Sequence, residues 1–380
     1  MNISLKKNRK DLAFTFVVVI FVVILFFIKT GFEPEKSPDT VRCKAKVVSV
    51  DNSEVRQYGI VKIGLQKLQL RILSSKYEDR VVTSENQLIG KMELDKIFSE
   101  GDVVYVTLET ENGNIHHVNV IDHYRLHVEF ALLVIFAVFL IAFAGYTGLK
   151  AMLSFIFAAL CIWKLLLPAF LKGYDPLWIS LAIVSLLTFV IIFLVGGVTR
   201  KGLAAFLGAA AGIILTCILA IVFGRLFRIH GAVKPFSETL LYSGYGHLNL
   251  SHIFLSGIFI AASGAVMDIA MDIASSQNEL HRKHPEISRK DLILSGFSVG
   301  RAVIGTMTTT LLLAYSGSYT TLLMVFMAQR VPTLNMLNIT YVASEILHTL
   351  VGSFGLLSVA PLTAIIGGFI FTFKKKGGAY

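Results

Sequence analysis

Two aspartates and one arginine lie within segments that are apolar enough to be buried in a lipid bilayer. Asp268 and Asp272 are four residues apart, so a helix would place both carboxylates on one face. Arg301 lies about ten residues into the next apolar segment. A charge at the bilayer centre costs about 3 kcal/mol or more, so such residues usually face a bundle interior, a charged partner or a water-filled path. These three residues are the first candidates for chemistry.

Glu345 is a further acidic candidate, because the predicted spans place it at a depth similar to that of Asp268 and Arg301. At about 1.5 Å per helical residue, Asp268 would lie ~9 Å and Arg301 ~14 Å from the inner ends of their spans. We therefore predict one polar cluster in the inner half of the bundle, with Arg301 paired to Asp268 or Glu345. Two roles stay open: a static pair that locks the helices, or a site that exchanges protons or a cation.

Other polar residues in the apolar segments carry weaker predictions. Thr306 and Thr310 follow Arg301 and could line a polar path, although hydroxyls in membrane helices often bond to their own backbone. The glycine pairs at 208 and 212 and at 296 and 300 have the small-xxx-small spacing that lets helices approach closely.

Motifs typical of enzymes are weak in this chain. A G-x-S-x-G match at 296–300 lies in an apolar helical segment, whereas a serine nucleophile needs a strand–turn–helix context. Glu345 and His348 have a spacing used by metal ligands, but it occurs in a single copy. No Walker A sequence occurs. We expect no catalytic residue, no cofactor and no metal site.

The composition is that of a membrane protein with many spans. The 380 residues are 54% hydrophobic and 16% charged, and the mean hydropathy is +0.69; soluble domains rarely reach such values. The net charge of +10 comes from basic residues between apolar runs, which indicates the positive-inside pattern rather than nucleic-acid binding. The predicted environment is the lipid bilayer, and no nucleic-acid partner is expected.

The chain divides into three predicted parts. Residues 1–30 contain the apolar run 12–28 and are interpreted as a retained signal-anchor, the first span. Residues 31–125 are polar, with short β-branched runs separated by predicted turns, among them 51–53 and 112–113, and predict a small OB-like β-barrel or sandwich. The predicted strands are 41–50, 58–65, 68–73, 102–110 and 115–121. This domain is expected to bind a partner rather than to catalyse.

Residues 126–380 form the predicted multi-span domain, so the fold class is mostly α, with eight to ten spans in all. A helix needs about 20 apolar residues to cross the hydrocarbon core. The candidates are 127–144, 150–168, 176–195, 202–224, 251–274 and 292–315. Residues 318–373 hold one or three crossings; three are preferred, because glycines at 352 and 355 indicate a break.

The basic clusters set the predicted orientation. Lysines and arginines at 6–10, 200–201, 282–290 and 374–376 would all be cytoplasmic. Both termini are then inside the cell, and the β-rich domain is outside, on a multi-pass protein of the bacterial cytoplasmic membrane. The loop 225–251 weakly opposes this rule, because it carries Lys234 and two arginines on the predicted outer side.

Several segments resemble the YibE/F-like family of bacterial membrane proteins. They are GAVMDIAMDIASSQNEL, PEISRKDLILSGFSVGRAVIGTMTTTLLLAYSG, FLVGGVTRKGLAAFLGAAAG and SEILHTLVGSFGLLSVAPLTAIIGG. The polar positions that match are Asp268, Glu279, Pro285, Gly300, Arg301, Thr306 and Thr310. The resemblance covers nearly the whole chain and implies location and architecture, but little about activity. The first segment is also loosely similar to the proton-coupling helix of SecDF and RND transporters.

Two functions remain in view. The first is a secondary transporter or permease for an unknown small substrate or ion, coupled to protons or a cation through Asp268. The second is a membrane scaffold or assembly partner that does not transport, whose external domain binds another protein and whose charge cluster is structural. An enzyme is not expected.

Overall fold

The computed structural model describes residues 2–34 and 39–373, without the side chains of residues 2–9 and 318. The contacts between residues divide the chain into two compact units. One unit is Glu33–Phe139, and the other combines Met1–Phe32 with Leu140–Tyr380. The predicted orientation partly depends on residues that the structure does not describe. These are the basic tail at 374–376 and the side chains of residues 6, 7 and 9.

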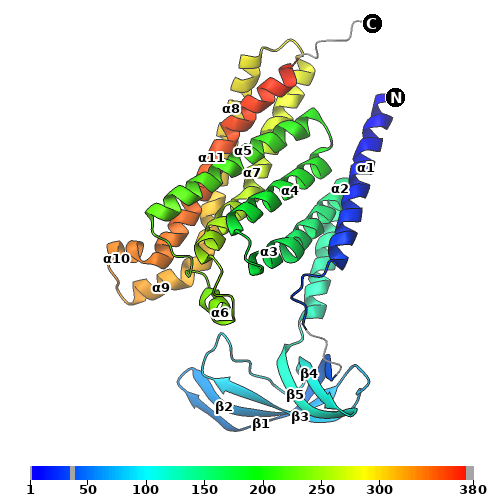
Figure 1. Ribbon diagram of the computed structural model, residues 1–380, viewed down its shortest axis with the longest axis vertical. Helices are drawn as coiled ribbons and strands as arrows, with labels where there is room; N and C mark the ends of the chain where they lie inside the picture. Colours follow the sequence, from blue (N-terminus) through cyan, green and yellow to red (C-terminus); the bar gives the residue numbers. More distant parts are fainter. Residues whose placement is uncertain (1, 35–38, 374–380) are drawn as a thin grey trace. The chain divides into compact units, whose positions relative to one another are not determined.

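The first unit contains a nearly closed, five-stranded antiparallel barrel in its described part (Figure 1). The strand order is β3-β2-β1-β4-β5, and a hydrogen bond of 2.6 Å from Ser84 to the Val118 carbonyl joins β3 to β5. The strands are β1 (Thr40–Tyr58), β2 (Val61–Ile72), β3 (Val81–Ile89), β4 (Val103–Glu111) and β5 (Asn114–His123). Alternate residues of the strands, such as Ala45, Val47, Leu68, Leu70, Val104 and Val106, fill the interior. The predicted small barrel is therefore confirmed.

The strand boundaries differ from the prediction in two ways. The predicted runs 58–65 and 68–73 belong to one strand, β2, and β3 had not been singled out. The predicted turn at 51–53 is an irregularity inside β1, where the register shifts between Asp51 and Glu54. The predicted turn at Asn112 and Gly113 is confirmed, and positive φ angles of 49° and 80° suit a tight hairpin.

Among the described residues, seven helices are long and apolar enough to cross a membrane. They include α1 (Asn2–Phe27), α2 (Leu126–Cys161), α4 (Pro176–Gly196), α5 (Arg200–Leu226), α7 (Leu250–Lys283), α8 (Arg289–Ser316) and α11 (Thr340–Thr372). Shorter elements are the π-turn Ile162–Leu166, α3 (Leu167–Leu171), α6 (Ser237–Tyr242), the 3₁₀ turn Gly317–Tyr319, α9 (Thr320–Ala328) and α10 (Thr333–Asn338). Short side-chain caps fix several beginnings; Asp175, for example, accepts a bond of 2.9 Å from the Leu177 amide at the start of α4.

The predicted crossings after residue 318 need correction. One helix, α11, runs through the expected break at 352–355, and α9 and α10 have only nine and six residues. The glycines of this stretch serve close packing instead. A Cβ added at Gly355 would lie 2.1 Å from Oγ1 of Thr216. The predicted break after residue 144 is present, because Gly145 has φ 54° and ψ −129° within α2.

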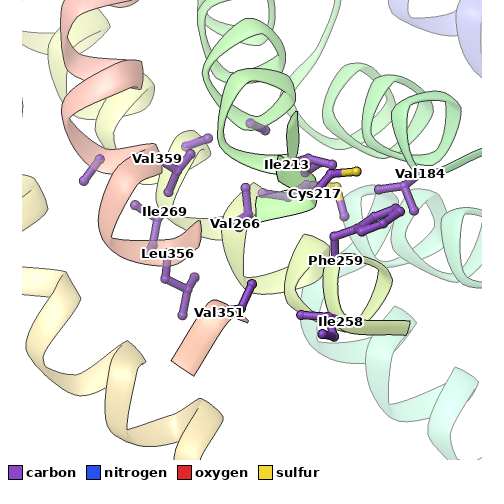
Figure 2. Packing of buried hydrophobic residues seen from close by; sticks show 14 of the residues in the cluster. Val184, Ile213, Cys217, Ile258, Phe259, Val266, Ile269, Val351, Leu356 and Val359 are labelled. Carbon is purple, nitrogen blue, oxygen red and sulfur yellow. The ribbon is translucent and has the colours of Figure 1, made fainter. Parts of the chain in front are cut away.

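Helices α5, α7, α8 and α11 pack side by side around the main apolar core (Figure 1). Figure 2 shows this packing, with Ile213 and Cys217 from α5, Ile258, Phe259, Val266 and Ile269 from α7, and Val351, Leu356 and Val359 from α11. The predicted glycine pairs lie at the helix contacts. Gly208 faces Thr363, Gly212 faces Val359, and Gly300 faces Ala360.

Helix α1 packs against α4 and runs antiparallel to it. The Val198 amide, just after α4, donates a bond of 3.3 Å to the Asp11 carboxylate. Near the other end of α1, Lys164 Nζ donates a bond of 2.9 Å to the Ile28 carbonyl. Asp11 of α1 therefore lies beside the turn that precedes the basic pair Arg200 and Lys201.

Candidate functional site

The charged residues predicted from the sequence do not form one ion-paired cluster. Asp268 and Asp272 share an exposed face of α7, and Arg301 is exposed on α8. None of these three residues takes part in the ion pairs within 4.0 Å that the described residues form. The expected pairing of Arg301 with Asp268 or Glu345 is therefore wrong for the described side chains, whereas a functional role of the aspartates stays a prediction.

Glu345 instead pairs with a lysine from a distant loop. Its side chain is 11% exposed, and its Oε1 accepts hydrogen bonds from Lys234 Nζ and, at 2.6 Å, from the Tyr319 hydroxyl. Lys234 belongs to the loop between α5 and α6, and Tyr319 closes the short turn after α8. Glu345 is five residues from Thr340, about 8 Å along α11. It therefore lies near the start of α11, whereas its predicted depth in the inner half of the bundle stays a prediction.

The loop that carries Lys234 is fixed on both sides of the lysine. Before it, Ile229 and Val233 are buried in the main core. Gly231 has φ +80°, and a Cβ there would lie 2.2 Å from the backbone of Leu250 at the start of α7. After it, the Ser237 hydroxyl donates a bond of 2.7 Å to the Lys234 carbonyl. This anchoring brings the lysine to Glu345 although 111 positions separate them.

Two aromatic rings lie near the ammonium group of Lys234. Its Nζ lies 5.8 Å from the ring centroids of both Phe254 and Tyr319, within the range of cation–π attraction. Burial, together with the hydrogen bond to Glu345, raises the pKa of Tyr319 well above its usual range. The Tyr319 hydroxyl therefore keeps its proton and remains a donor to the carboxylate.

His348 lies one turn after Glu345 on the same face of α11. Its Nδ1 is 4.0 Å from Oε2 of Glu345, too far for a hydrogen bond. Its ring lies against Tyr315, with centroids 4.3 Å apart, and meets the edge of Phe254. Neither ring nitrogen has a hydrogen-bond partner in the described part of the chain. Among all the residues that the structure describes, there is no group of three His, Cys, Asp or Glu side chains that could hold a metal ion.

Two cavities adjoin the ion pair, and Tyr319 borders both. The first, of about 230 Å³, is almost entirely apolar and is lined by Leu312, Tyr315, Ser316, Tyr319, Leu323, Val342, Glu345, Ile346, Thr349 and Leu350. The second, of about 490 Å³, is more polar and is lined by residues 232–239 with Tyr319, Leu322 and Tyr341. Glu345 belongs to the wall of the first cavity and Lys234 to that of the second. The ion pair therefore lies at the boundary between them.

The predicted polar lining residues bond to their own helix. The Thr306 and Thr310 hydroxyls each donate a bond of 3.0 Å to a backbone carbonyl of α8. Their side chains are exposed, so their hydrogen-bonding capacity is partly used within the helix.

A buried glutamine ties three helices together and was not anticipated. Gln277 of α7 is fully buried, and its Nε2 donates bonds of 3.0 and 2.9 Å to the carbonyls of Leu292 and Ala364. Gly296 and Gly367 make room for it, because added Cβ atoms would lie 2.7 and 2.0 Å from its side-chain amide. Gln277 lies in the polar stretch SSQNEL, so the sequence did not indicate that this one side chain is buried between helices.

The sequence did contain two signals for the observed site. Lys234 was a cation on the side where the charge rule disfavours one, and Glu345 and His348 had a common helical face. Neither signal names the partner, since loop and helix are far apart in the chain. The pair becomes visible only when the bundle packs.

Comparisons with known proteins identify two regions. The family model described as YibE/F-like protein matches residues 132–373, and the one described as YibE/F family N-terminal domain matches residues 41–123. Neither a curated protein nor a solved structure matches the chain. The two family matches cover most of the chain, so the resemblance drawn from the sequence is confirmed.

Proposed function

We propose that this chain, which belongs to the YibE/F-like family, is a multi-pass membrane permease with the Lys234–Glu345 pair as its gate. The observation that carries the proposal is a buried carboxylate at the boundary of two cavities, held by a lysine from a loop. Breaking a buried ion pair leaves an uncompensated charge, whereas replacing both partners by apolar groups is often neutral. A pair of this kind is a weak source of stability. Replacement of the lysine at the Glu345 carboxylate by a proton or a cation is, however, a suitable coupling step.

The proposed membrane topology has eight crossings. The 46-residue helical stretch Leu126–Leu171 counts as two of them, because the break at Gly145 interrupts the helix and the stretch is about twice the length that one span needs. An even number puts both termini on one side, which we place in the cytoplasm from the basic clusters. The barrel is then extracytoplasmic, and the gate lies near the outer surface. Asp268, on the exposed face of α7, remains the predicted coupling carboxylate.

Reconstituted protein tests the permease proposal. The full chain in liposomes would be exposed to gradients of small cationic, anionic and neutral solutes while proton or charge movement is recorded. We expect at least one class to drive a current that Glu345→Gln abolishes. A correctly folded protein that carries no current with any class would overturn the proposal.

A second function, assembly with another membrane protein, is favoured by one observation. Arg301 is exposed on α8 and has no ion pair among the described residues, and an unpaired guanidinium facing lipid is costly. In this alternative an acidic residue of a partner protein covers it. Purification in mild detergent after crosslinking in the membrane tests this: a partner that is lost in Arg301→Gln supports assembly, and its retention contradicts this role.

A further inference from the structure

We propose that the 230 Å³ cavity beside Glu345 binds a small organic cation with an apolar body, and that Lys234 occupies its ammonium subsite as a tethered competitor. This inference names a substrate class for the permease and rests on that proposed function. It is carried by the surroundings of the Lys234 ammonium, the nature of the cavity walls, and the unequal exposure of the two charges.

The position of Lys234 Nζ marks a subsite built for an ammonium group. A buried carboxylate supplies the opposite charge, and two aromatic rings lie at 5.8 Å. Carboxylates and aromatic faces are the groups that recognise ammonium ligands in proteins. The Tyr319 hydroxyl fixes Glu345 by its bond of 2.6 Å, so the carboxylate would stay in place if the lysine moved.

The cavity next to this subsite suits the apolar part of such a ligand. Leucine, isoleucine and valine side chains, with two tyrosine rings, form most of its walls. Ligand pockets commonly combine apolar walls with a few polar groups that fix orientation. A neutral or anionic ligand cannot neutralise the Glu345 carboxylate, so it could bind only while the lysine stays paired or together with a separate cation. The chemistry of the site therefore favours a cationic ligand.

The lysine is the more exposed member of the pair. Its side chain is 41% exposed, whereas that of Glu345 is 11% exposed. Lys234 also forms part of the wall of the more polar 490 Å³ cavity, beside Ser237 and Glu238. The lysine can therefore turn toward that cavity, whereas the carboxylate remains buried and requires a replacement cation. A ligand ammonium supplies it.

Binding of benzyltrimethylammonium to the full chain, purified in detergent, tests the proposal by equilibrium dialysis. Tetramethylammonium probes the charge alone, and neopentylbenzene, the uncharged isostere, probes the apolar part alone. Lys234→Gln should tighten binding by about 5- to 150-fold, the usual range for removal of a coupled competitor. Glu345→Gln should abolish it. Weaker or unchanged binding in Lys234→Gln, or equal competition by the uncharged isostere, would overturn the inference.

A pair of neighbouring variants keeps the test independent of the ion pair. Leu312 lines the cavity and Leu313 does not; they are 52% and 65% exposed, so both tolerate a large side chain. Leu312→Trp should weaken binding at least about tenfold by filling the cavity, and Leu313→Trp should leave it unchanged. An equal effect of the two would refute the cavity assignment. Cation binding without any flux would leave the inference standing and remove the permease proposal, whereas a proton-coupled current with neutral solutes alone would do the reverse.

Discussion

Removal of the lysine should destabilise the protein more than removal of the glutamate. Lys234→Gln leaves the Glu345 carboxylate buried, with the Tyr319 hydroxyl as a neutral hydrogen-bond donor, and a broken buried pair costs about 3 kcal/mol at the lower end of the usual range. Glu345→Gln leaves a lysine that is already 41% exposed and can turn to solvent. The loss is then closer to that of one hydrogen bond, about 1 kcal/mol.

The double variant Lys234→Gln with Glu345→Gln removes both charges and should recover about 2 kcal/mol relative to Lys234→Gln alone. At about 2 °C per kcal/mol for a large domain, the melting temperature should fall by about 6 °C in Lys234→Gln and by about 2 °C in Glu345→Gln. Thermal unfolding of the detergent-solubilised protein, followed by size-exclusion chromatography, measures these shifts.

Lys172→Gln is the matched control, because Lys172 is exposed and belongs to none of the ion pairs between described residues. Its melting temperature should equal that of the wild type. The reasoning fails if Glu345→Gln is the less stable single variant, because the buried member of the pair would then not be the carboxylate. It also fails if the two single effects simply add in the double variant, which would show that the residues do not interact.

Three further outcomes are expected. Gly367→Ala should lower the free energy of unfolding by about 1–3 kcal/mol, since its Cβ would lie 2.0 Å from the buried glutamine of α7. The control Gly305→Ala has nothing within 4 Å of the new Cβ and should melt at or above the wild-type temperature. Equal losses in the two variants would contradict the packing argument. Asp268→Asn should abolish transport without lowering the melting temperature, and a clear loss of stability would indicate a hidden partner. In intact cells, Asn114→Cys should react with an impermeant maleimide, because this position is exposed beside the hairpin turn of the barrel. Cys43 should react slowly, because it is buried in the barrel and its thiol pKa is raised. Labelling of Asn114→Cys only after permeabilisation would show that the barrel lies inside the cell.

The helices were predictable because length and hydropathy alone define a candidate span. The glycines near residue 352 misled the span count, since glycine marks a break in one context and a helix contact in another. Only the packed structure shows that Gly355 faces Thr216 of α5. In the barrel, β3 escaped notice because its sequence VVTSENQLI is mostly polar after two valines, and its pairing with β2 outweighs that weak local preference.

Of the four charged residues predicted to cluster, Glu345 alone has an ion pair among the described residues, and its partner Lys234 was not predicted. Depth arguments treat every helix as an isolated rod of known direction, so an error in the span count changes the predicted position of Glu345 along its helix. They also omit loops, which is why Lys234 was missed as a partner. The cost of a lone charge in an apolar segment predicts a partner for Glu345, and Lys234 pairs with it, but that argument does not identify the partner.

Arg301 is the residue that best separates the two functions. A buried or lipid-facing carboxylate can be neutralised by a proton, but a guanidinium stays charged in proteins. Arg301 must therefore meet water in a permease path or an acidic group of another protein in an assembly. Arg301→Cys, placed in a variant without the three native cysteines, distinguishes these situations by its reaction with a charged, impermeant maleimide. Rapid reaction in the purified and in the membrane-embedded protein alike would support a water path. Protection in the membrane that disappears on purification would support the partner, and with it a structural role for the exposed charges.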